Sequence, residues 1–214
     1  MVDTYGLDIP RTLEEVCDPR RLALLVYDMQ AGILSQIADS ARVTAQVTRV
    51  LDAARAAGVR VFFTRHLSLP PALMGRFQYR QAMAWQRVDN PAQVRPWFLR
   101  DTPGFALVPE IVPRPDEAIA DKITMSAMEG TFLDIAWRDC GITAFAVVGV
   151  AMEVGIEPTA RHAADLGYIP IIIADACGAG HQEAAQRALD GLRYSGDSLI
   201  TDVETFCTLL GNEQ

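Results

Sequence analysis

The chain has 214 residues, of which 50% are hydrophobic and 21% are charged, and its formal net charge is −8. A chain of this size is expected to fold as one domain, residues 1–214, with a sizeable hydrophobic core. The net negative charge argues against nucleic acid and against an anionic membrane surface as partners, and no apolar run is long enough to span a bilayer.

The first predicted unit is a strand, a helix and a second strand. Leu22–Val26 (LALLV) is continuously apolar, which is typical of a parallel strand covered on both faces. A helix is expected from Ser40, which suits an N-cap, to a stop at Gly58, because apolar residues recur between them at helical spacing. Val59–Thr64 (VRVFFT) is the second predicted strand.

The same alternation recurs toward the C-terminus. Helices are expected at about 131–140, 157–166 and 182–194, with a last one ending near 210, and the further strands are Ala118–Ile123, Thr143–Val148, Tyr168–Ala174 and Ser198–Thr201. The sequence therefore predicts an α/β fold: a doubly wound, six-stranded, mostly parallel sheet with helices on both faces, which is a Rossmann-like three-layer sandwich.

Residues 65–117 interrupt this rhythm. They hold Trp85 and Trp97, two of the three tryptophans, and most of the prolines, and a short helix is expected at Gln81–Val88. A connection this long inside a compact domain is usually functional. We expect an elaborated loop that is either an active-site wall or lid or a contact between subunits.

The four cysteines, Cys17, Cys140, Cys177 and Cys207, are scattered along the chain. No C-x-x-C pair and no matching histidine spacing is present, which argues against a zinc finger. The N-terminal stretch MVDTYGLDIPRTLEEV contains no apolar signal-peptide region. We therefore expect a cytoplasmic protein with reduced thiols.

Three residues stand at or near the ends of predicted strands, namely Asp28, Lys122 and Gly155. In a doubly wound sheet such ends can lie side by side at the edge where ligands bind. A buried acid and a buried lysine are each costly, and a mutual Asp28–Lys122 pair would offset both costs. Because desolvation often exceeds the Coulomb attraction of a buried pair, a functional role is favoured over a purely structural one.

Three segments together resemble the signature of the isochorismatase-like hydrolases: LALLVYDMQ (22–30), KITMSAMEGTFLD (122–134) and VVGVAMEVGIEPTARHAADLGY (147–168). The similarity covers about residues 20 to 207. In most of that family, the residues matching Asp28 and Lys122 join a cysteine at the position of Gly155, and the thiolate attacks an amide carbonyl. The resemblance implies a hydrolase that lacks this nucleophile.

True isochorismatases, which cleave a vinyl ether, resemble this chain in having no cysteine at that position. The resemblance then implies that Asp28 is a general acid, that Lys122 holds the carboxyl group and the substrate in register, and that Gly155 leaves room for water or the ether oxygen. Two alternatives stay open. One is an amide or carbamate hydrolase that uses water or another nucleophile such as Cys177, and the other is a non-catalytic relative that binds a ligand or serves in an assembly.

Further residues near these segments are candidates for substrate binding. The resemblance to isochorismatases implies a substrate-contacting polar residue just after the second strand and an arginine further along that reads a substrate carboxylate. Two positions in the turn GVAMEVGI (149–156) also flank the site. In isochorismatases an aromatic residue stands where this chain has alanine in that turn. The candidates are His66, Arg76, Arg80, Arg87, Ala151 and Glu153.

No cofactor is expected. A metal bound by Asp28 and His66 would need further histidines close by, and the segment SLPPALMGRF (68–77) supplies none, so the sequence predicts a metal-independent site. The expected partner is a small polar or anionic substrate. Because members of the resembling family commonly associate, we also expect a homo-oligomer, either a dimer or a tetramer.

Overall fold

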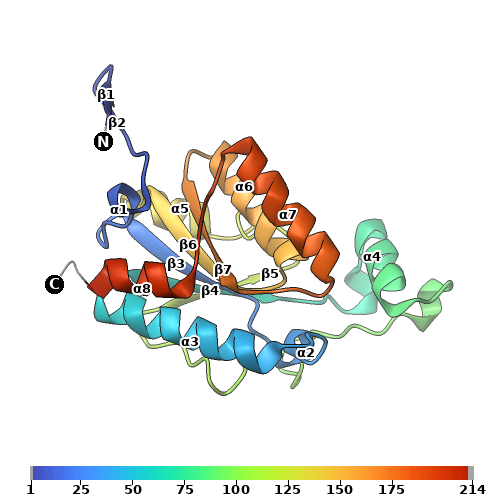
Figure 1. Cartoon of the computed structure of the whole chain (residues 1–214). Coiled ribbons are helices and arrows are strands. Elements are labelled where there is room, and N and C mark those ends of the chain that lie inside the picture. Colours follow the sequence, from blue (N-terminus) through green and yellow to red (C-terminus); the bar gives the residue numbers. More distant parts are fainter. Residues whose placement is uncertain (1, 212–214) are drawn as a thin grey trace.

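The computed structural model describes residues 2–211 and contains one parallel six-stranded sheet with the strand order β5-β4-β3-β6-β7-β8 (Figure 1). This confirms the predicted α/β architecture. The strands are β3 (Leu22–Tyr27), β4 (Arg60–His66), β5 (Ala118–Lys122), β6 (Ala144–Val150), β7 (Ile169–Gly178) and β8 (Leu199–Thr201).

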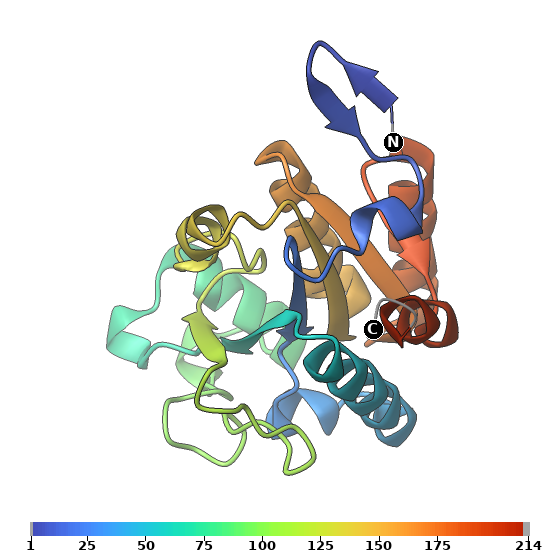
Figure 2. The same ribbon diagram turned by 90° about the vertical axis from the view of Figure 1, so that its left-hand side faces the viewer.

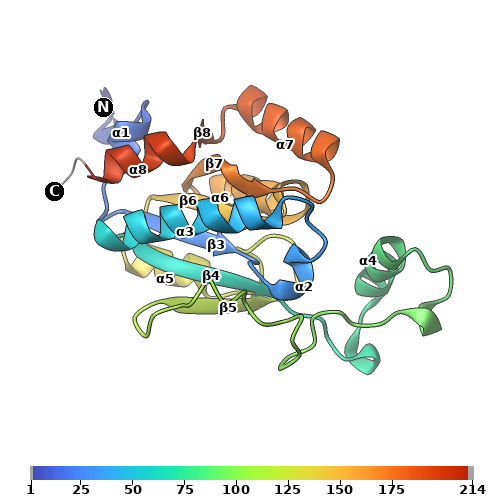
Figure 3. The same ribbon diagram turned by 60° about the horizontal axis from the view of Figure 1, so that its bottom comes forward.

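Helices cover both faces of the sheet (Figures 1 and 3). One face is packed against α3 (Ser40–Ala56) and α8 (Val203–Gly211). The other face is packed against α5 (Leu133–Asp139), α6 (Glu157–Asp165) and α7 (Gln182–Ser195). The result is a three-layer arrangement.

The central strand β3 shows why the sequence folds in this way. All six of its residues are buried, because helices lie above and below it. Leu22, Leu24 and Val26 belong to the core under α3 and α8, whereas Ala23, Leu25 and Tyr27 belong to the core on the other side. The alternation follows from the two-residue period of a strand, which sends successive side chains to opposite faces.

Several short elements were not expected from the sequence. They are the antiparallel hairpin of β1 (Val2–Thr4) and β2 (Leu7–Ile9), the single turns α1 (Leu13–Val16) and α2 (Ala31–Leu34), and a five-residue π-helical turn, Met152–Ile156. The hairpin extends away from the body of the molecule (Figures 1 and 2). Helices this short carry too few residues to produce a recognisable periodicity.

Segment 65–117 leaves the carboxyl end of β4, and its part around α4 (Arg76–Gln86) projects as an arm beside the carboxyl ends of the strands (Figures 1 and 3). The segment then returns along α3 to the amino end of β5, where Glu117 pairs with Arg55. Helix α4 begins earlier than the predicted Gln81–Val88, and two 3₁₀ turns, Pro71–Leu73 and Pro91–Gln93, flank it. Within residues 2–211, no helix is long and apolar enough to cross a membrane.

Candidate active site

The carboxyl ends of β3, β4, β5 and β6 meet at one edge of the sheet, where they surround a cavity of about 240 Å³. The chain leaves β3 in one direction to form β4 and β5, and later returns to add β6 on the other side, so this edge is a topological switch point. The cavity is lined by Tyr27, Asp28, Ile33, Gln36, Ile37, His66, Trp85, Trp97, Phe98, Lys122, Met125, Val150, Ala151, Val154, Gly155 and Gly180.

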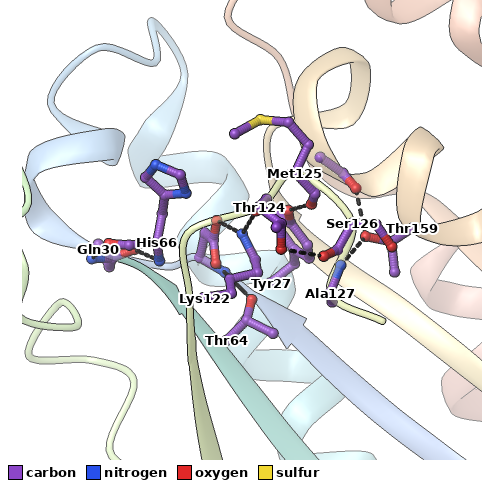
Figure 4. Close-up of polar contacts among 12 residues, drawn as sticks. Tyr27, Gln30, Thr64, His66, Lys122, Thr124, Met125, Ser126, Ala127 and Thr159 are labelled. Atoms are coloured by element: carbon purple, nitrogen blue, oxygen red, sulfur yellow. Dashed lines mark hydrogen bonds and ion pairs between the residues drawn. The ribbon is translucent and has the colours of Figure 1, made fainter. Parts of the chain in front are cut away.

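Asp28 and Lys122 form a buried ion pair on the cavity wall. The Lys122 Nζ donates to Asp28 Oδ2 at 2.7 Å, and the Thr64 hydroxyl donates to Asp28 Oδ1 at 2.6 Å (Figure 4). The side chains of Lys122 and Asp28 are only 1% and 5% exposed. Asp28 also has a φ of 46°, a left-handed conformation that non-glycine residues adopt rarely and that is frequent at functional sites.

Lys122 has two further contacts beside its carboxylate partner. Its Nζ lies 4.3 Å from the centre of the Tyr27 ring, over the ring face, and donates to the Thr124 carbonyl at 3.3 Å. Burial is the main cause that lowers the pKa of Lys122, and the attraction of Asp28 opposes this shift. The Lys122 ammonium therefore gives up a proton more readily than an exposed lysine does.

His66, the register partner of Lys122 on the neighbouring strand β4, contributes a neutral imidazole to the cavity wall. Burial, together with the charge of Lys122, lowers the pKa of His66 to about 4. Its ring meets Phe98 and Trp85 edge-on, at centroid distances of 5.8 and 6.4 Å. The buried Gln30 side chain fixes the backbone here, because it accepts from the His66 N–H at 2.6 Å and donates to the His66 carbonyl at 3.0 Å.

Gly155 lies in the π-helical turn between β6 and α6, and the Tyr27 ring fills the space beside it. A Cβ atom on Gly155 would lie 2.6 Å from Tyr27 Cε1 and closer still to the hydroxyl oxygen, which donates to the Met125 carbonyl. From the sequence we expected Gly155 to leave room for water or the ether oxygen. Gly155 does line the cavity, and that role stays a prediction, but the phenol occupies the volume into which a side chain at 155 would project.

The backbone N–H groups of this turn are hydrogen-bonded within the turn. The N–H groups of Val154, Gly155 and Ile156 all donate to the Ala151 carbonyl, at 3.2, 3.0 and 3.2 Å. The buried Thr159 hydroxyl donates to the Gly155 carbonyl at 2.7 Å and accepts from the Ala127 N–H at 2.9 Å (Figure 4). The turn is thereby tied to the loop that follows β5. The peptide bond between Val150 and Ala151 is cis.

The other predicted substrate-binding residues divide into two groups. His66 and Ala151 line the cavity, together with Asp28, Lys122 and Gly155. Arg76 and Arg87 are exposed residues at the two ends of α4, and Arg80 is an exposed residue within it. None of these three arginines lines the cavity. Glu153 lies outside as well, where its Oε1 accepts from the His181 N–H at 2.7 Å.

Cys177 does not line the cavity either. Its thiol is buried in the strand β7, where it donates to the Val147 carbonyl at 3.6 Å. Burial raises the pKa of the Cys177 thiol well above its ordinary value, so a thiolate is disfavoured there. Of the residues that the structure describes, no cysteine borders the cavity.

Sequence reasoning missed several residues that shape the site. Tyr27 ends an aliphatic strand with a polar group, which is a signal that can be read in the sequence. Gln30 and Thr64 carry no such signal, because their partners are distant along the chain. Within residues 2–211 there is also no group of three His, Cys, Asp or Glu side chains that would hold a metal ion, and metal independence stays a prediction.

Comparison with known proteins shows which proteins this chain resembles. The isochorismatase domain family matches residues 22–204. The ureidoacrylate amidohydrolase RutB of Serratia proteamaculans (strain 568) is 29% identical over an alignment of 210 residues, and the match covers 90% of this chain and 84% of that protein.

Solved structures share the fold. A cysteine hydrolase from Pseudomonas syringae pv. phaseolicola 1448A superposes with a TM-score of 0.81 at 21% identity, covering 93% of this chain and 96% of the other. The N-carbamoylsarcosine amidase from Thermoplasma acidophilum superposes with a TM-score of 0.70 at 18% identity, covering 86% and 96%. With the family match spanning most of its length, the chain belongs to the isochorismatase family and is an isochorismatase-like hydrolase.

Proposed function

We propose that this protein hydrolyses a small substrate by direct attack of water, without a covalent enzyme intermediate. The observation that supports this most strongly is the Asp28–Lys122 ion pair, 2.7 Å long, on the wall of a cavity that no described cysteine borders. In this proposal Gly155 stands at the position that carries the nucleophilic cysteine in most of the family. A thiolate route would need a thiol at the cavity, whereas water needs only a group that takes its proton.

The ion pair suits proton transfer in both directions. Asp28 accepts from Thr64 and Lys122 and so holds a fixed orientation. Lys122 has three N–H bonds, of which Asp28 and the Thr124 carbonyl take two, and the third is left for a substrate oxygen. Asp28 then removes a proton from the attacking water and passes it to the leaving group, while Lys122 stabilises the negative charge that develops on the oxygen.

The cavity favours an uncharged substrate that carries an amide, ureido or carbamate carbonyl. Its walls are mostly apolar, His66 is neutral, and no arginine among the described residues lines it. The names of two relatives, an amidohydrolase and an N-carbamoylsarcosine amidase, support carbon–nitrogen bond cleavage. The sequence predicted a small polar or anionic substrate, and of these two we propose the polar, uncharged one.

Cleavage of an enol ether is the second candidate. The match to the isochorismatase domain supports it, as does the absence of a side chain at Gly155, since this reaction uses no covalent intermediate. Here a protonated Asp28 delivers its proton to the methylene carbon, and water adds to the resulting oxocarbenium ion. The lowered pKa of Lys122 assists this route, because it eases proton transfer within the pair.

A substrate panel tests the proposal. Amides, ureides, carbamates and enol ethers, each in an uncharged and a carboxylated version, are incubated with the protein, and ammonia, amine or carbonyl products are measured. We expect turnover of uncharged carbonyl–nitrogen substrates. Protein quenched during turnover is weighed by mass spectrometry, and we expect only the unmodified mass.

Two outcomes would overturn the proposal. Accumulation of a protein carrying the acyl part of the substrate would indicate a covalent nucleophile. No turnover of any compound, combined with ligand-induced stabilisation against heat, would favour the non-catalytic alternative.

A further inference from the structure

Tyr27 occupies an unusual place in this site, because its side chain fills the volume that a side chain at residue 155 would need. A Cβ on Gly155 would lie 2.5 Å from Tyr27 Cζ and 2.6 Å from Cε1. Contacts this short with ring carbons cannot be relieved by a small torsional adjustment, because the ring belongs to the buried core on this side of the sheet and is only 2% exposed.

Glycine is not required at 155 for its conformational freedom. The glycines with positive φ in this chain are Gly6, Gly58, Gly130, Gly141, Gly149, Gly167 and Gly196, and Gly155 is not one of them. An alanine therefore fits the backbone conformation of the turn but not the space beside it. The absence of a side chain at 155 has a steric cause.

The Tyr27 hydroxyl is held by the loop after β5, because it donates to the Met125 carbonyl (Figure 4). Burial raises the pKa of Tyr27 well above its usual range, so the phenol stays neutral. With its proton given to Met125, the oxygen keeps a lone pair that can accept a hydrogen bond.

We propose that Tyr27 and Gly155 are a matched pair that determines the type of reaction at this site. The phenol, whose ring face lies against the Lys122 ammonium, excludes any side-chain nucleophile at 155. It presents its oxygen as an acceptor for the attacking water or for a substrate N–H. Tyr27 is thus a positioning residue for water-based hydrolysis. The steric exclusion stands on geometry alone, whereas the positioning of water rests on the proposed function.

A cycle of variants tests the steric pairing without any substrate. Gly155→Ala should strongly lower the midpoint of urea unfolding, or prevent folding, because its Cβ meets the ring. Tyr27→Val removes the ring and should itself lower the midpoint of urea unfolding. The Tyr27→Val/Gly155→Ala double variant should unfold at nearly the same urea concentration as Tyr27→Val, because the Cβ at 155 no longer meets a ring. Tyr168 is a matched control, since it is also buried in the same core but bonds to Asp134. Tyr168→Val should not rescue Gly155→Ala.

A thiol provides a second readout. In Tyr27→Val/Gly155→Cys the new cysteine faces the cavity, and we expect iodoacetamide to modify it faster than the buried Cys177, as measured by peptide mass mapping. The pairing is wrong if Gly155→Ala alone is as stable as the parent, if the double variant with alanine is destabilised by the full sum of the single effects, or if the thiol introduced at position 155 reacts no faster than Cys177.

Kinetics test the positioning of water. Tyr27→Phe keeps the ring and its contact with Lys122 but removes the hydroxyl. With the best substrate from the panel, we expect kcat to fall by roughly tenfold to a hundredfold at a nearly unchanged KM, since misplacement of a reacting group costs about this much. Tyr168→Phe should leave both constants unchanged. An unchanged kcat for Tyr27→Phe would overturn the positioning of water by Tyr27, but the steric pairing of Tyr27 with Gly155 would still stand. A substrate panel without any turnover would overturn the proposed function and would leave the steric pairing untouched.

Discussion

The Lys122 ammonium is stabilised by groups that are themselves fixed by the fold. The Asp28 carboxylate, the Thr124 carbonyl and the Tyr27 ring surround it at the end of β5. A buried ion pair of this kind adds little net stability compared with apolar residues, because both ions lose their hydration. Its presence at a cavity is better explained by chemistry than by stability.

Removing one partner of this pair should be more harmful than removing both. Lys122→Met leaves the Asp28 carboxylate buried without its counter-ion, and we expect a loss of about 3–5 kcal/mol in the free energy of unfolding. Asp28→Asn/Lys122→Met should recover a part of that loss, and asparagine is chosen because it tolerates the left-handed backbone of residue 28. Urea unfolding of the three proteins measures this, and a double variant less stable than Lys122→Met would contradict the expectation.

His66 should make the stability of the protein depend on pH. Its pKa is about 4 in the folded protein, against 6.5 for an ordinary histidine, so between these values the unfolded chain binds more protons. Stability therefore rises with pH across this window and is lost as the pH falls, by about 1.4 kcal/mol per unit at most.

An NMR titration of the three histidines checks this prediction. One imidazole should titrate near pH 4 and should be missing from the spectrum of His66→Gln. The unfolding free energy of His66→Gln should depend less on pH than that of the parent. A His66 resonance that titrates near 6.5 would show that the ring is not desolvated as the structure implies.

At the scale of elements, the π-helical turn Met152–Ile156 depends on one hydroxyl for its connection to the loop after β5. Thr159 bonds both the Gly155 carbonyl and the Ala127 N–H, and it is fully buried. Thr159→Val keeps the shape but leaves the Ala127 N–H unpaired, so we expect a loss of about 1–3 kcal/mol.

A second threonine provides the control for this substitution. The Thr48 hydroxyl donates to the Thr44 carbonyl within α3, at 2.9 Å, and helix N–H groups do not depend on it. Thr48→Val should cost much less than Thr159→Val in chemical unfolding. Equal effects of the two substitutions would argue against a special role for Thr159.

The elements differ in how far the sequence predicts them. Leu22–Val26 is a continuous apolar run, and the segment after Ser40 has apolar residues at helical spacing. The strand and the helix are therefore recovered with small shifts at their ends, for example β3 ending at Tyr27 and α3 at Ala56. The arm at 65–117 has no such pattern. Its course depends on contacts with the body, so the sequence could not predict which of its side chains reach the cavity.

The residues of the candidate site also differ in how far the sequence predicts them. Asp28, Lys122 and Gly155 are found from sequence because the carboxyl ends of parallel strands converge at one edge. Arg76 and Arg87 were expected there because the resembling isochorismatases use an arginine to read a substrate carboxylate, yet α4 carries both residues away from the cavity. The contact between Tyr27 and Gly155 joins residues far apart in the chain, and only the three-dimensional structure reveals it.

At the scale of the whole molecule, self-association stays a prediction. Large apolar side chains are exposed on the arm, among them Leu73 and Phe77, and at the start of α5, where Phe132 and Ile135 lie. Sedimentation equilibrium should give two or four times the chain mass of 23.4 kDa. A monomer at micromolar concentration would contradict this, and Phe77→Asp should weaken the association if the arm takes part in it. Cytoplasmic location is likewise a prediction.

Everything proposed about the chemistry depends on the carboxylate at the end of β3. The most direct test is kcat/KM for Asp28→Asn with the best substrate of the panel, in a protein whose circular dichroism and unfolding transition match those of a folded domain. We expect a fall of at least about a hundredfold, since asparagine keeps the shape but cannot accept the proton of water. An activity within twofold of the parent would show that Asp28 does not carry the reaction.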